Sequence, residues 1–258
     1  AGSGGQTVTQ GGGAAVEDSA PVITGSSTEN TLTIKAESGQ TANVTLSGAN
    51  IDVSGKGKAA VSTNGEGNVS IELDGDNTLK SATNHAGLEK NNGGSLTIAD
   101  ENKNGKLTAK GGDYGAGIGG GWRGSGSDIT ISGGEVNATG GVNGAGIGGG
   151  CYGYGNNITV SGDAKLKVQG GVEDNIDGAG AGIGNSGSSD ERAIPVTGAE
   201  VEPDTSGLTT NGSIEYYAPG ADMEKDKPEK TTVGTLSPQE KPIEPIEPAV
   251  PEQPEAER

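Results

Sequence analysis

One short pattern returns along the middle of the chain: a polar residue, an apolar residue, Thr or Ser, and a second apolar residue. Its copies begin at Asn43, Asn68, Ser95, Asp128 and Asn157, and successive copies lie 25 to 33 residues apart. Alternation of polar and apolar residues indicates a β-strand with one buried face. Recurrence at a nearly fixed distance of this size indicates that similar structural units follow one another and stack.

Two further markers recur in step with this pattern. One is an Ala-Gly-Ile triplet or a close variant, at 60–61, 86–88, 116–118, 145–147 and 181–183. The other is a third strand-like segment, at 49–53, 106–108, 135–138 and 165–168. Three short strands in each step, with almost no helical periodicity, describe one coil of a parallel β-solenoid. We therefore predict an all-β fold, a single-stranded parallel β-helix of about five or six coils over residues 26–198. The alternative is an antiparallel sandwich, which would not require successive units to look alike.

The composition fits such a thin coil and excludes a conventional large core. Only 29% of the 258 residues are hydrophobic and 2% are aromatic, with no Phe, whereas 51 are Gly. An ordinary globular chain is closer to half apolar, with roughly 7% Gly. Ile, Val, Leu and Ala are sufficient to fill a narrow interior between stacked coils, so the low aromatic content does not indicate disorder.

The two ends of the sequence differ from the repeat in composition. Residues 1–25 are rich in Gly and are predicted to be a flexible lead-in. Ten of the eleven prolines lie at or after Pro195, and residues 199–258 carry an excess of acidic side chains, so we predict a disordered linker or stalk there. Within it, residues 213–217 could add one capping strand. We expect export and anchoring signals to lie outside this sequence, together with other domains of a longer surface protein.

Net charge and residue usage limit the classes of function. The formal charge of −18 repels phosphate groups, so we expect no nucleic-acid partner. No run approaches the roughly 18 to 20 apolar residues of a membrane span, so direct membrane insertion is not expected. The single Cys151 excludes an internal disulfide, and with the single His85 it argues against most enzyme chemistries, although carboxylates, Lys or Arg could still catalyse a reaction.

The glycine segments match two ligand-binding patterns only in part. Residues 115–120 fit the pattern G-x-G-x-x-G, which returns at 144–149, but no helix-forming sequence follows either copy, as dinucleotide binding would require. We interpret both copies as tight corners of the coil and predict no cofactor. The regularly placed Asp of calcium-binding nonapeptide repeats is also missing. One acidic loop remains as a candidate calcium site, with an exposed loop free of metal as the alternative. Its candidate ligands are Glu173, Asp174 and Asp177.

Gly-Ala-Gly-Ile-Gly-Gly-Gly occurs at 115–121 and again at 144–150, and each copy is followed by a short spacer and by Ile-Thr-Ile-Ser-Gly-Gly or Ile-Thr-Val-Ser-Gly-Asp. This sequence resembles the Gly-rich parallel β-helix repeats of large surface proteins of Gram-positive gut bacteria, which are often described as carbohydrate-binding domain proteins. The resemblance covers residues 26–190. It implies an extracellular location, at the cell surface or secreted, and a polysaccharide or glycan ligand, and it supplies no catalytic residue.

Alignment of the two glycine segments places aromatic side chains on neighbouring coils. Trp122 and Arg123 fall in register with Cys151 and Tyr152, and Tyr154 follows two residues later. Exposed Trp and Tyr rings present flat apolar faces to the C–H groups of sugars, while Arg, Asn and Asp bind the hydroxyl groups. We therefore predict a glycan-binding platform. Its candidate residues are Tyr114, Trp122, Arg123, Tyr152 and Tyr154. The alternative is that these side chains only cover the glycine corners.

Three functions fit these observations. The first is a non-enzymatic module of a bacterial cell-surface or secreted protein that binds carbohydrate or acts in adhesion. The second is a structural spacer of a larger adhesin, without a ligand of its own. The third is a polysaccharide lyase or hydrolase, for which Asp113, Arg123 and Asp128 are the candidate cluster of charged residues.

Overall fold

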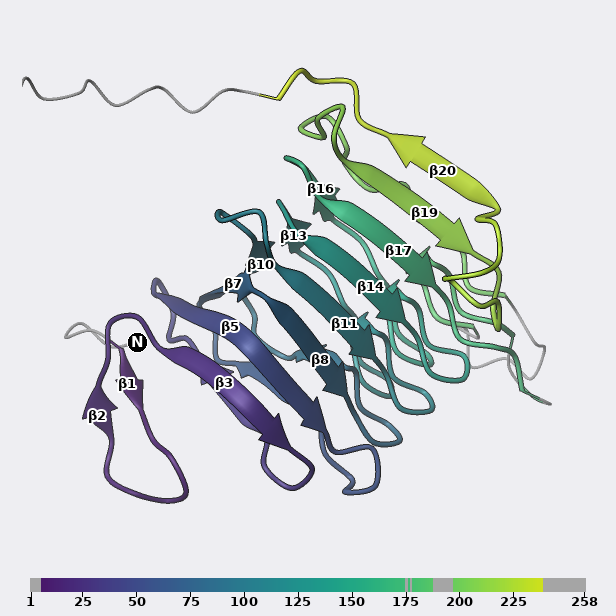
Figure 1. Ribbon diagram of the computed structural model, residues 1–258. Helices are drawn as coiled ribbons and strands as arrows, with labels where there is room; N and C mark the ends of the chain where they lie inside the picture. Colours follow the sequence, from purple (N-terminus) through teal and green to yellow (C-terminus); the bar gives the residue numbers. More distant parts are fainter. Residues whose placement is uncertain (1–5, 175, 177, 188–196, 239–258) are drawn as a thin grey trace, which may run out of the picture.

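The polypeptide winds into a rod of stacked coils (Figure 1). The computed structural model describes residues 6–174, 176, 178–187 and 197–238, and the elements formed by these residues are strands, with no helix among them. Strands of successive coils pair side by side in three ladders along the rod, and the pairs between coils are parallel. The predicted all-β parallel β-solenoid is therefore confirmed. None of the described segments is a helix long and apolar enough to cross a membrane.

Each complete coil contributes one strand to each ladder. The first ladder consists of β3 (Val22–Ser27), β5 (Thr41–Asp52), β7 (Asn68–Asp74), β10 (Leu96–Ala99), β13 (Ile129–Ile131) and β16 (Ile158–Val160). The second ladder begins with the later residues of β3 and β5 and continues with β8 (Asp76–Lys80), β11 (Lys106–Lys110), β14 (Glu135–Thr139), β17 (Lys165–Gln169) and β19 (Ser213–Tyr217). The third ladder consists of β4 (Leu32–Lys35), β6 (Val61–Asn64), β9 (Leu88–Lys90), β12 (Ile118–Gly119), β15 (Ile147–Gly148) and β18 (Ile183–Gly184). In the described part of the chain, these six strands of the third ladder are separated by five turns of the solenoid.

The register of the first ladder follows the predicted repeat in its later coils. Leu96 pairs with Ile129, which pairs with Ile158. At the start of the repeat, Val69 pairs with Ala42 rather than with Val44, so the predicted first step is two residues too short. A shift of two residues leaves the same set of side chains on the buried face. The alternating pattern therefore could not distinguish the two registers.

One strand of the second ladder has no counterpart in the predicted repeat. β8 carries Asn77 at the buried position that Leu107 occupies in the next coil. The Asn77 amide oxygen accepts a hydrogen bond from the Ala49 N–H at 2.8 Å, and its amide nitrogen donates to the Lys106 carbonyl at 3.2 Å. Because backbone groups of both neighbouring coils satisfy this polar side chain, it can replace an apolar residue in the interior.

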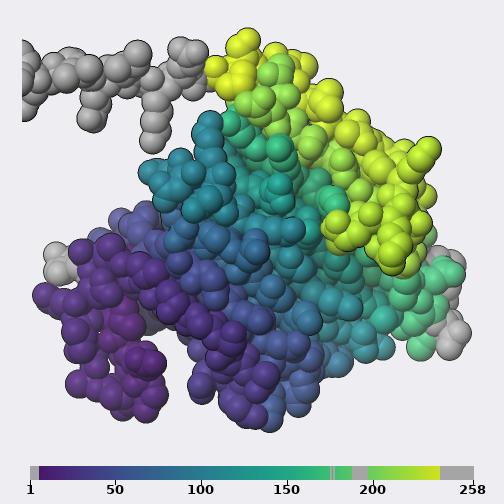
Figure 2. Space-filling view, viewed as in Figure 1, coloured from purple at the N-terminus to yellow at the C-terminus, as the bar shows by residue number. Residues whose placement is uncertain are grey.

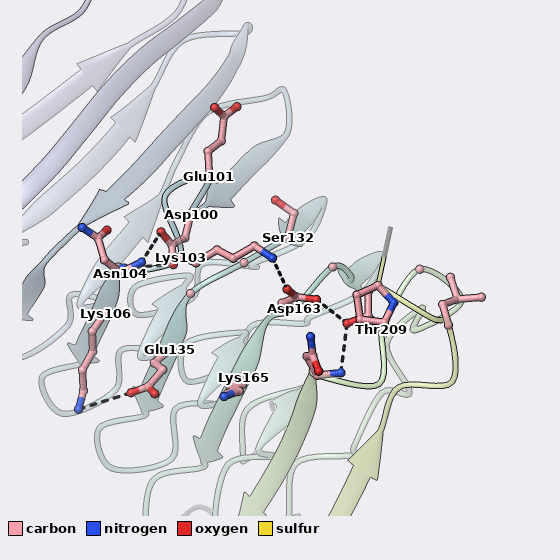
Figure 3. A pocket seen from close by; sticks show the side chains of 18 of the residues that line it. Asp100, Glu101, Lys103, Asn104, Lys106, Ser132, Glu135, Asp163, Lys165 and Thr209 are labelled. Atoms are coloured by element: carbon pink, nitrogen blue, oxygen red, sulfur yellow. Dashed lines mark hydrogen bonds and ion pairs between the residues drawn. The ribbon is translucent and has the colours of Figure 1, made fainter. Parts of the chain in front are cut away.

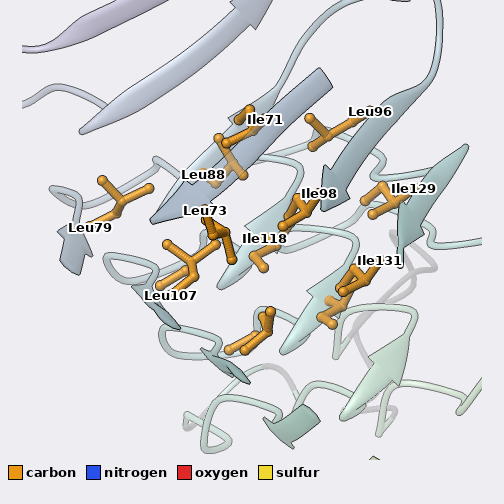
Figure 4. Close-up of a cluster of buried hydrophobic side chains, with 14 of the residues drawn as sticks. Ile71, Leu73, Leu79, Leu88, Leu96, Ile98, Leu107, Ile118, Ile129 and Ile131 are labelled. Carbon is orange, nitrogen blue, oxygen red and sulfur yellow. The ribbon is translucent and has the colours of Figure 1, made fainter. Parts of the chain in front are cut away.

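The interior is filled by rows of aliphatic side chains from successive coils (Figure 4). Ile71, Ile98 and Ile131 form one row of the first ladder, and Leu88 and Ile118 belong to a row of the third. All five side chains are fully buried. Burial of apolar area, at about 25 cal/mol per Å², is the main contribution that stabilises such a core.

The corners after the third ladder require glycine. Gly119, Gly148 and Gly184 have φ angles of 133°, 134° and 134°, a region that side chains rarely adopt. A Cβ atom on Gly119 would lie 2.1 Å from the carbonyl oxygen of Gly148, and a Cβ atom on Gly148 would lie 2.1 Å from that of Gly184. These glycines therefore allow neighbouring coils to approach each other backbone to backbone.

A cap covers the C-terminal end of the solenoid. β19 continues the second ladder by pairing in parallel with β17, and β20 (Lys230–Val233) pairs with β19 in the antiparallel direction. The carboxylate of Glu200 accepts hydrogen bonds from the N–H groups of Gly182 and Ile183 at 2.6 and 3.1 Å, which closes the third ladder. In Figure 2, these last described residues, in yellow-green and yellow, cover one end of the rod.

The chain after residue 198 therefore differs from the predicted linker as far as residue 238. The capping strand predicted at 213–217 coincides with β19. Leu208 and Ile214 are fully buried and belong to the same hydrophobic cluster as the coils. The acidic, Pro-containing composition of residues 199–258 suggested a linker, and it did not indicate that these two apolar residues are buried. Residues 239–258, the rest of the predicted disordered tail, lie outside the described residues.

Residues 6–25 also differ from the predicted flexible lead-in. β1 (Thr7–Val8) and β2 (Val16–Glu17) form a short antiparallel hairpin, and β3 begins the first coil ahead of the predicted boundary at residue 26. The Gln6 side chain ties the hairpin to the coils, because its amide nitrogen donates to the Asn43 carbonyl at 2.9 Å and its oxygen accepts from the Asn43 N–H. A Gly-rich sequence with two-residue strands has no periodicity from which this hairpin could be predicted.

Candidate functional site

The predicted aromatic residues gather mainly on the corner that links the third ladder to the first. We call it the glycine corner; in two adjacent coils it comprises residues 119–128 and 148–157. Here the Arg123 N–H donates to the Cys151 carbonyl at 2.8 Å. This contact places Trp122 and Arg123 on the coil next to Cys151 and Tyr152, in the register expected from the alignment of the two glycine segments.

Trp122, Arg123 and Tyr152 form a group that we call the aromatic stack. The guanidinium carbon of Arg123 lies 4.8 Å from the centre of the Trp122 ring and 5.6 Å from the centre of the Tyr152 ring. Both distances are within the range of about 6 Å in which a cation is attracted to an aromatic face. Trp122 nevertheless stays 48% exposed, so part of its ring remains accessible to a ligand.

Tyr154 extends this exposed aromatic surface along the same corner. Its side chain is 49% exposed. Its N–H donates to the Ser125 hydroxyl at 3.2 Å, and its carbonyl accepts from the Gly126 N–H at 2.9 Å. These contacts with the preceding coil fix Tyr154 between the aromatic stack and β16.

Tyr114 belongs to a different corner, the one that links the second ladder to the third. Its carbonyl accepts a hydrogen bond from the Cys151 N–H at 2.8 Å, so its backbone touches the glycine corner beside the aromatic stack. The Tyr114 side chain is partly buried. Four of the five candidate residues therefore share one corner, and the fifth approaches it from another.

Three of the candidate residues have an uncommon backbone conformation. The φ angles of Tyr114, Arg123 and Tyr152 are 70°, 60° and 65°. A left-handed backbone at a bulky residue costs of order 1–3 kcal/mol, and such residues cluster at functional sites. Glycine would occupy these positions without that cost. The sequence does not predict this conformation, because these positions hold Tyr and Arg and not Gly or Asn, the residues that usually indicate a left-handed backbone.

A buried polar network lies against the aromatic stack. In the coil before the stack, Glu89 takes the place of a corner glycine, and its carboxylate accepts hydrogen bonds from His85 Nδ1 at 2.8 Å and from the Ala86 N–H at 3.1 Å. A Cβ atom on Gly121 would lie 2.8 Å from Glu89 Oε2. The carboxylate thus lies directly beside the backbone that carries the stack. The lone histidine, for which the sequence suggested no role, is part of this support.

A groove of about 1070 Å³ runs along another corner, the one that links the first ladder to the second (Figure 3). The loop of residues 100–105 stands on one side of it, and residues 207–211 and 236–238 of the cap stand on the other. The short corner at 132–134 lies between them. The groove forms because the 100–105 loop is longer than the corresponding corner of the next coil. None of the residues of the aromatic stack lines this groove.

Lys103 reaches across the groove. Its Nζ lies 2.8 Å from Oδ2 of Asp163, which belongs to a coil two turns further along, and Asp163 Oδ1 accepts a hydrogen bond from the Thr209 hydroxyl at 2.6 Å (Figure 3). These contacts connect the 100–105 loop, the last complete coil and the cap. This connection could not be predicted from the sequence, because its members are far apart along the chain.

A protein-family model described as a beta helix repeat matches residues 103–122 and 129–151. The matched segments cover parts of two adjacent coils, including both copies of the glycine segment. The chain is a parallel β-helix protein. Comparison with curated proteins and with solved structures finds no significant match.

The ion pair across the groove should stabilise the β-helix protein in a pH-dependent manner. Hydrogen bonds from the Lys103 ammonium group and from the Thr209 hydroxyl hold the pKa of Asp163 below its ordinary value of 3.8. Because the folded-state pKa is lowered, this stabilisation is present above the ordinary value and is lost as the pH falls through the folded-state pKa. We expect Asp163→Asn to lower the free energy of unfolding by about 1 kcal/mol near neutral pH, since Lys103 is largely exposed to solvent. Urea unfolding at several pH values between about pH 7 and about pH 2 measures the difference, which should shrink as the pH falls through the folded-state pKa of Asp163.

Glu135→Gln is the matched control for this prediction. Its carboxylate lies 3.9 Å from the Lys106 ammonium group, too far for a strong hydrogen bond, so we expect its unfolding free energy to differ from that of the wild type by less than about 0.5 kcal/mol. Equal losses in both variants, or a loss in Asp163→Asn that persists at low pH, would contradict the assigned role of Asp163.

The candidate calcium loop is described only in part. Glu173 is exposed, and the Asp174 carboxylate accepts a hydrogen bond from the Ile176 N–H at 2.8 Å. Asp177 lies outside the described residues. In the part of the chain that the structure describes, no group of three His, Cys, Asp or Glu side chains could hold a metal ion. Calcium binding by this loop therefore stays a prediction.

The charged residues considered for catalysis belong to different structural features. Asp113 lies in the turn before Tyr114, Arg123 belongs to the aromatic stack, and Asp128 directly precedes β13. The Asp128 carboxylate accepts a hydrogen bond from the Asn157 amide. These contacts account for the positions of Arg123 and Asp128, and neither contact indicates a catalytic role. The enzyme alternative remains to be tested.

Proposed function

We propose that this protein is a non-enzymatic module of a bacterial cell-surface or secreted protein and that it binds carbohydrate, or acts in adhesion, through the glycine corner. The observation that carries the proposal is the exposed cation–π group formed by Trp122, Arg123 and Tyr152 on adjacent coils. Its ligand is a polysaccharide or another glycan, and other domains of a longer surface protein are its covalent neighbours.

The chemistry of the aromatic stack suits a sugar ligand. An exposed aromatic face can pack against the C–H groups of a sugar ring. The Arg123 guanidinium, which contacts both the Trp122 and the Tyr152 ring, offers several donors in a rigid plane to sugar oxygens. Contact with two rings already restricts the Arg123 side chain, which reduces the entropy that it would lose on binding.

The spacing of the coils favours a chain of sugars over a single sugar. Neighbouring strands lie about 4.8 Å apart, a distance comparable with the length of one sugar residue. Trp122 comes from one coil, and Tyr152 and Tyr154 come from the next. A glycan that lies along the rod can therefore contact aromatic rings from two coils in succession.

Loss of the Trp122 ring should weaken glycan binding at least about tenfold, because a buried aromatic contact at the centre of a site contributes on the order of 1–2 kcal/mol or more. A glycan array with host, plant and bacterial wall polysaccharides identifies the ligand. Titration calorimetry then compares the wild type with Trp122→Ala and Tyr152→Asn. Asn is chosen at position 152 because it tolerates the left-handed backbone, so the substitution removes the ring with little effect on the fold.

Val233→Ala is the control, since Val233 is 65% exposed on β20 and lies outside the glycine corner. Its affinity should equal that of the wild type. Unchanged affinity in both corner variants would refute the site, and a folded protein that retains no glycan would favour the spacer function. Release of new reducing ends from a bound polysaccharide would favour the lyase or hydrolase.

A further inference from the structure

A stripe of alternating charge runs along the groove between the first and second ladders. We call it the charge stripe, and its members are Asp76, Lys106, Glu135 and Lys165. These residues occupy the same position of the second ladder in four successive coils, because Lys106 pairs with Asp76 and with Glu135, and Glu135 pairs with Lys165. All four line the groove, whose lining also includes Asp100, Glu101 and the ion-paired Lys103 and Asp163. Negative and positive groups therefore alternate at the spacing of one coil, about 4.8 Å.

The side chains of the charge stripe form few polar contacts with one another. The one close approach between them is the distance of 3.9 Å from Lys106 Nζ to Glu135 Oε2 (Figure 3). Among the described residues, neither Asp76 nor Lys165 forms an ion pair or a side-chain hydrogen bond. Cross-strand pairing of opposite charges contributes roughly 0.2–1 kcal/mol per pair, and at 3.9 Å the Lys106–Glu135 pair leaves much of the hydrogen-bonding capacity of both groups unused.

The surroundings of the charge stripe have the shape of a site for a linear chain. The corner at 132–134 is short and contains two glycines, Gly133 and Gly134, whereas the longer 100–105 loop and the cap stand before and after it in the direction in which the coils stack. The Lys103–Asp163 ion pair crosses the groove, and Figure 3 shows it apart from Lys106, Glu135 and Lys165. An extended polymer can lie along the stripe without displacing this ion pair.

We propose that this groove binds a linear glycan in which acidic sugars alternate with neutral ones. Lys106 and Lys165 are two coils apart, about 9.6 Å, which is comparable with the length of a disaccharide. Their ammonium groups would bind the carboxylates or sulfates of successive acidic sugars. Between them, Glu135 would accept hydrogen bonds from the hydroxyl groups of a neutral sugar, and Asp76 would do the same on the outer side of Lys106.

The alternation also determines which polymers the groove disfavours. A chain with a negative charge on every sugar would bring one of these charges against Glu135, and like charges in contact reduce affinity. A neutral chain would offer no charged group to either ammonium group. This inference concerns a surface separate from the glycine corner and does not depend on the proposed function of the aromatic stack.

Binding to three immobilised polymers tests the proposal: hyaluronan, in which every second sugar is acidic; polygalacturonate, in which every sugar is acidic; and dextran, which is neutral. We expect retention on hyaluronan at physiological salt, with at least about fivefold weaker retention on the other two. Lys106→Gln and Lys165→Gln should each weaken hyaluronan binding about fivefold to tenfold. Glu135→Lys should shift the preference towards polygalacturonate.

Two controls separate this site from the aromatic stack. Lys58→Gln removes an exposed ammonium group outside the groove and should leave retention unchanged. Trp122→Ala should also leave hyaluronan retention unchanged, so failure of the stack and failure of the groove give different results. The proposal is overturned if the folded protein does not bind hyaluronan, if it binds polygalacturonate more strongly, or if the two lysine variants bind hyaluronan as the wild type does.

Discussion

Gly148→Ala should lower the free energy of unfolding by about 4 kcal/mol and the Tm on the order of 10 °C. The φ angle of Gly148 is 134°, where a side chain is strained. The added Cβ would also lie 2.1 Å from the Gly184 carbonyl oxygen and 3.2 Å from the Gly155 Cα. Both neighbours are backbone atoms of the stacked corners, so no side-chain rotation can relieve the contact. Thermal unfolding followed by circular dichroism measures the effect.

Gly55→Ala is the matched control for this substitution. No atom lies within 4 Å of a Cβ added at Gly55, and its φ angle is outside the left-handed region. We expect a change within about 0.5 kcal/mol, because the substitution acts mainly on the unfolded chain. If the Tm values of the two variants differed by less than about 2 °C, the corner glycines would not be the structural requirement that we infer.

Ile131→Ala should cost roughly 2–5 kcal/mol, since it removes a fully buried side chain and leaves a cavity. Ile131 lies between Ile98 and Val160 of the adjacent coils, which can close the cavity only in part. Stability in a solenoid depends mainly on contacts between neighbouring coils. We therefore expect hydrogen exchange to accelerate first in β10, β13 and β16 and much less in β4, which exchange measured by mass spectrometry can resolve.

Val22→Ala is the corresponding control, because the Val22 side chain is 55% exposed. Its unfolding free energy should change by less than about 0.5 kcal/mol. Uniformly faster exchange along the whole rod in Ile131→Ala would mean that the coils unfold as a single cooperative unit, contrary to the local response expected here.

The ladder architecture could be predicted from the sequence because each coil repeats the same requirement. Leu96, Ile129 and Ile158 must all face the interior and pair with one another, so one pattern is repeated several times. Where a coil satisfies this requirement differently, the pattern fails. β8 was missed because Asn77 is buried by hydrogen bonds to neighbouring backbone, and no rule of apolar periodicity identifies such a residue.

The two candidate surfaces differ in how far the sequence predicts them, because only the glycine corner belongs to the repeat. The neighbourhood of Trp122 and Tyr152 follows from the repeat, since both lie just after equivalent glycines. The groove depends on the extra length of one loop and on a cap that returns to the solenoid through Thr209. Such an arrangement has no periodic signal, because each contributing segment occurs once.

The cap makes the two ends of the rod unequal, and this has a consequence for how the molecule can change its length. β20 reverses the chain direction beside β19, so that end cannot accept another parallel coil. Ile118 and Ile147, by contrast, are equivalent positions 29 residues apart. Duplication of that module within the gene would insert a coil that matches both neighbours and would lengthen the rod by about 4.8 Å, with both ends of the molecule unchanged.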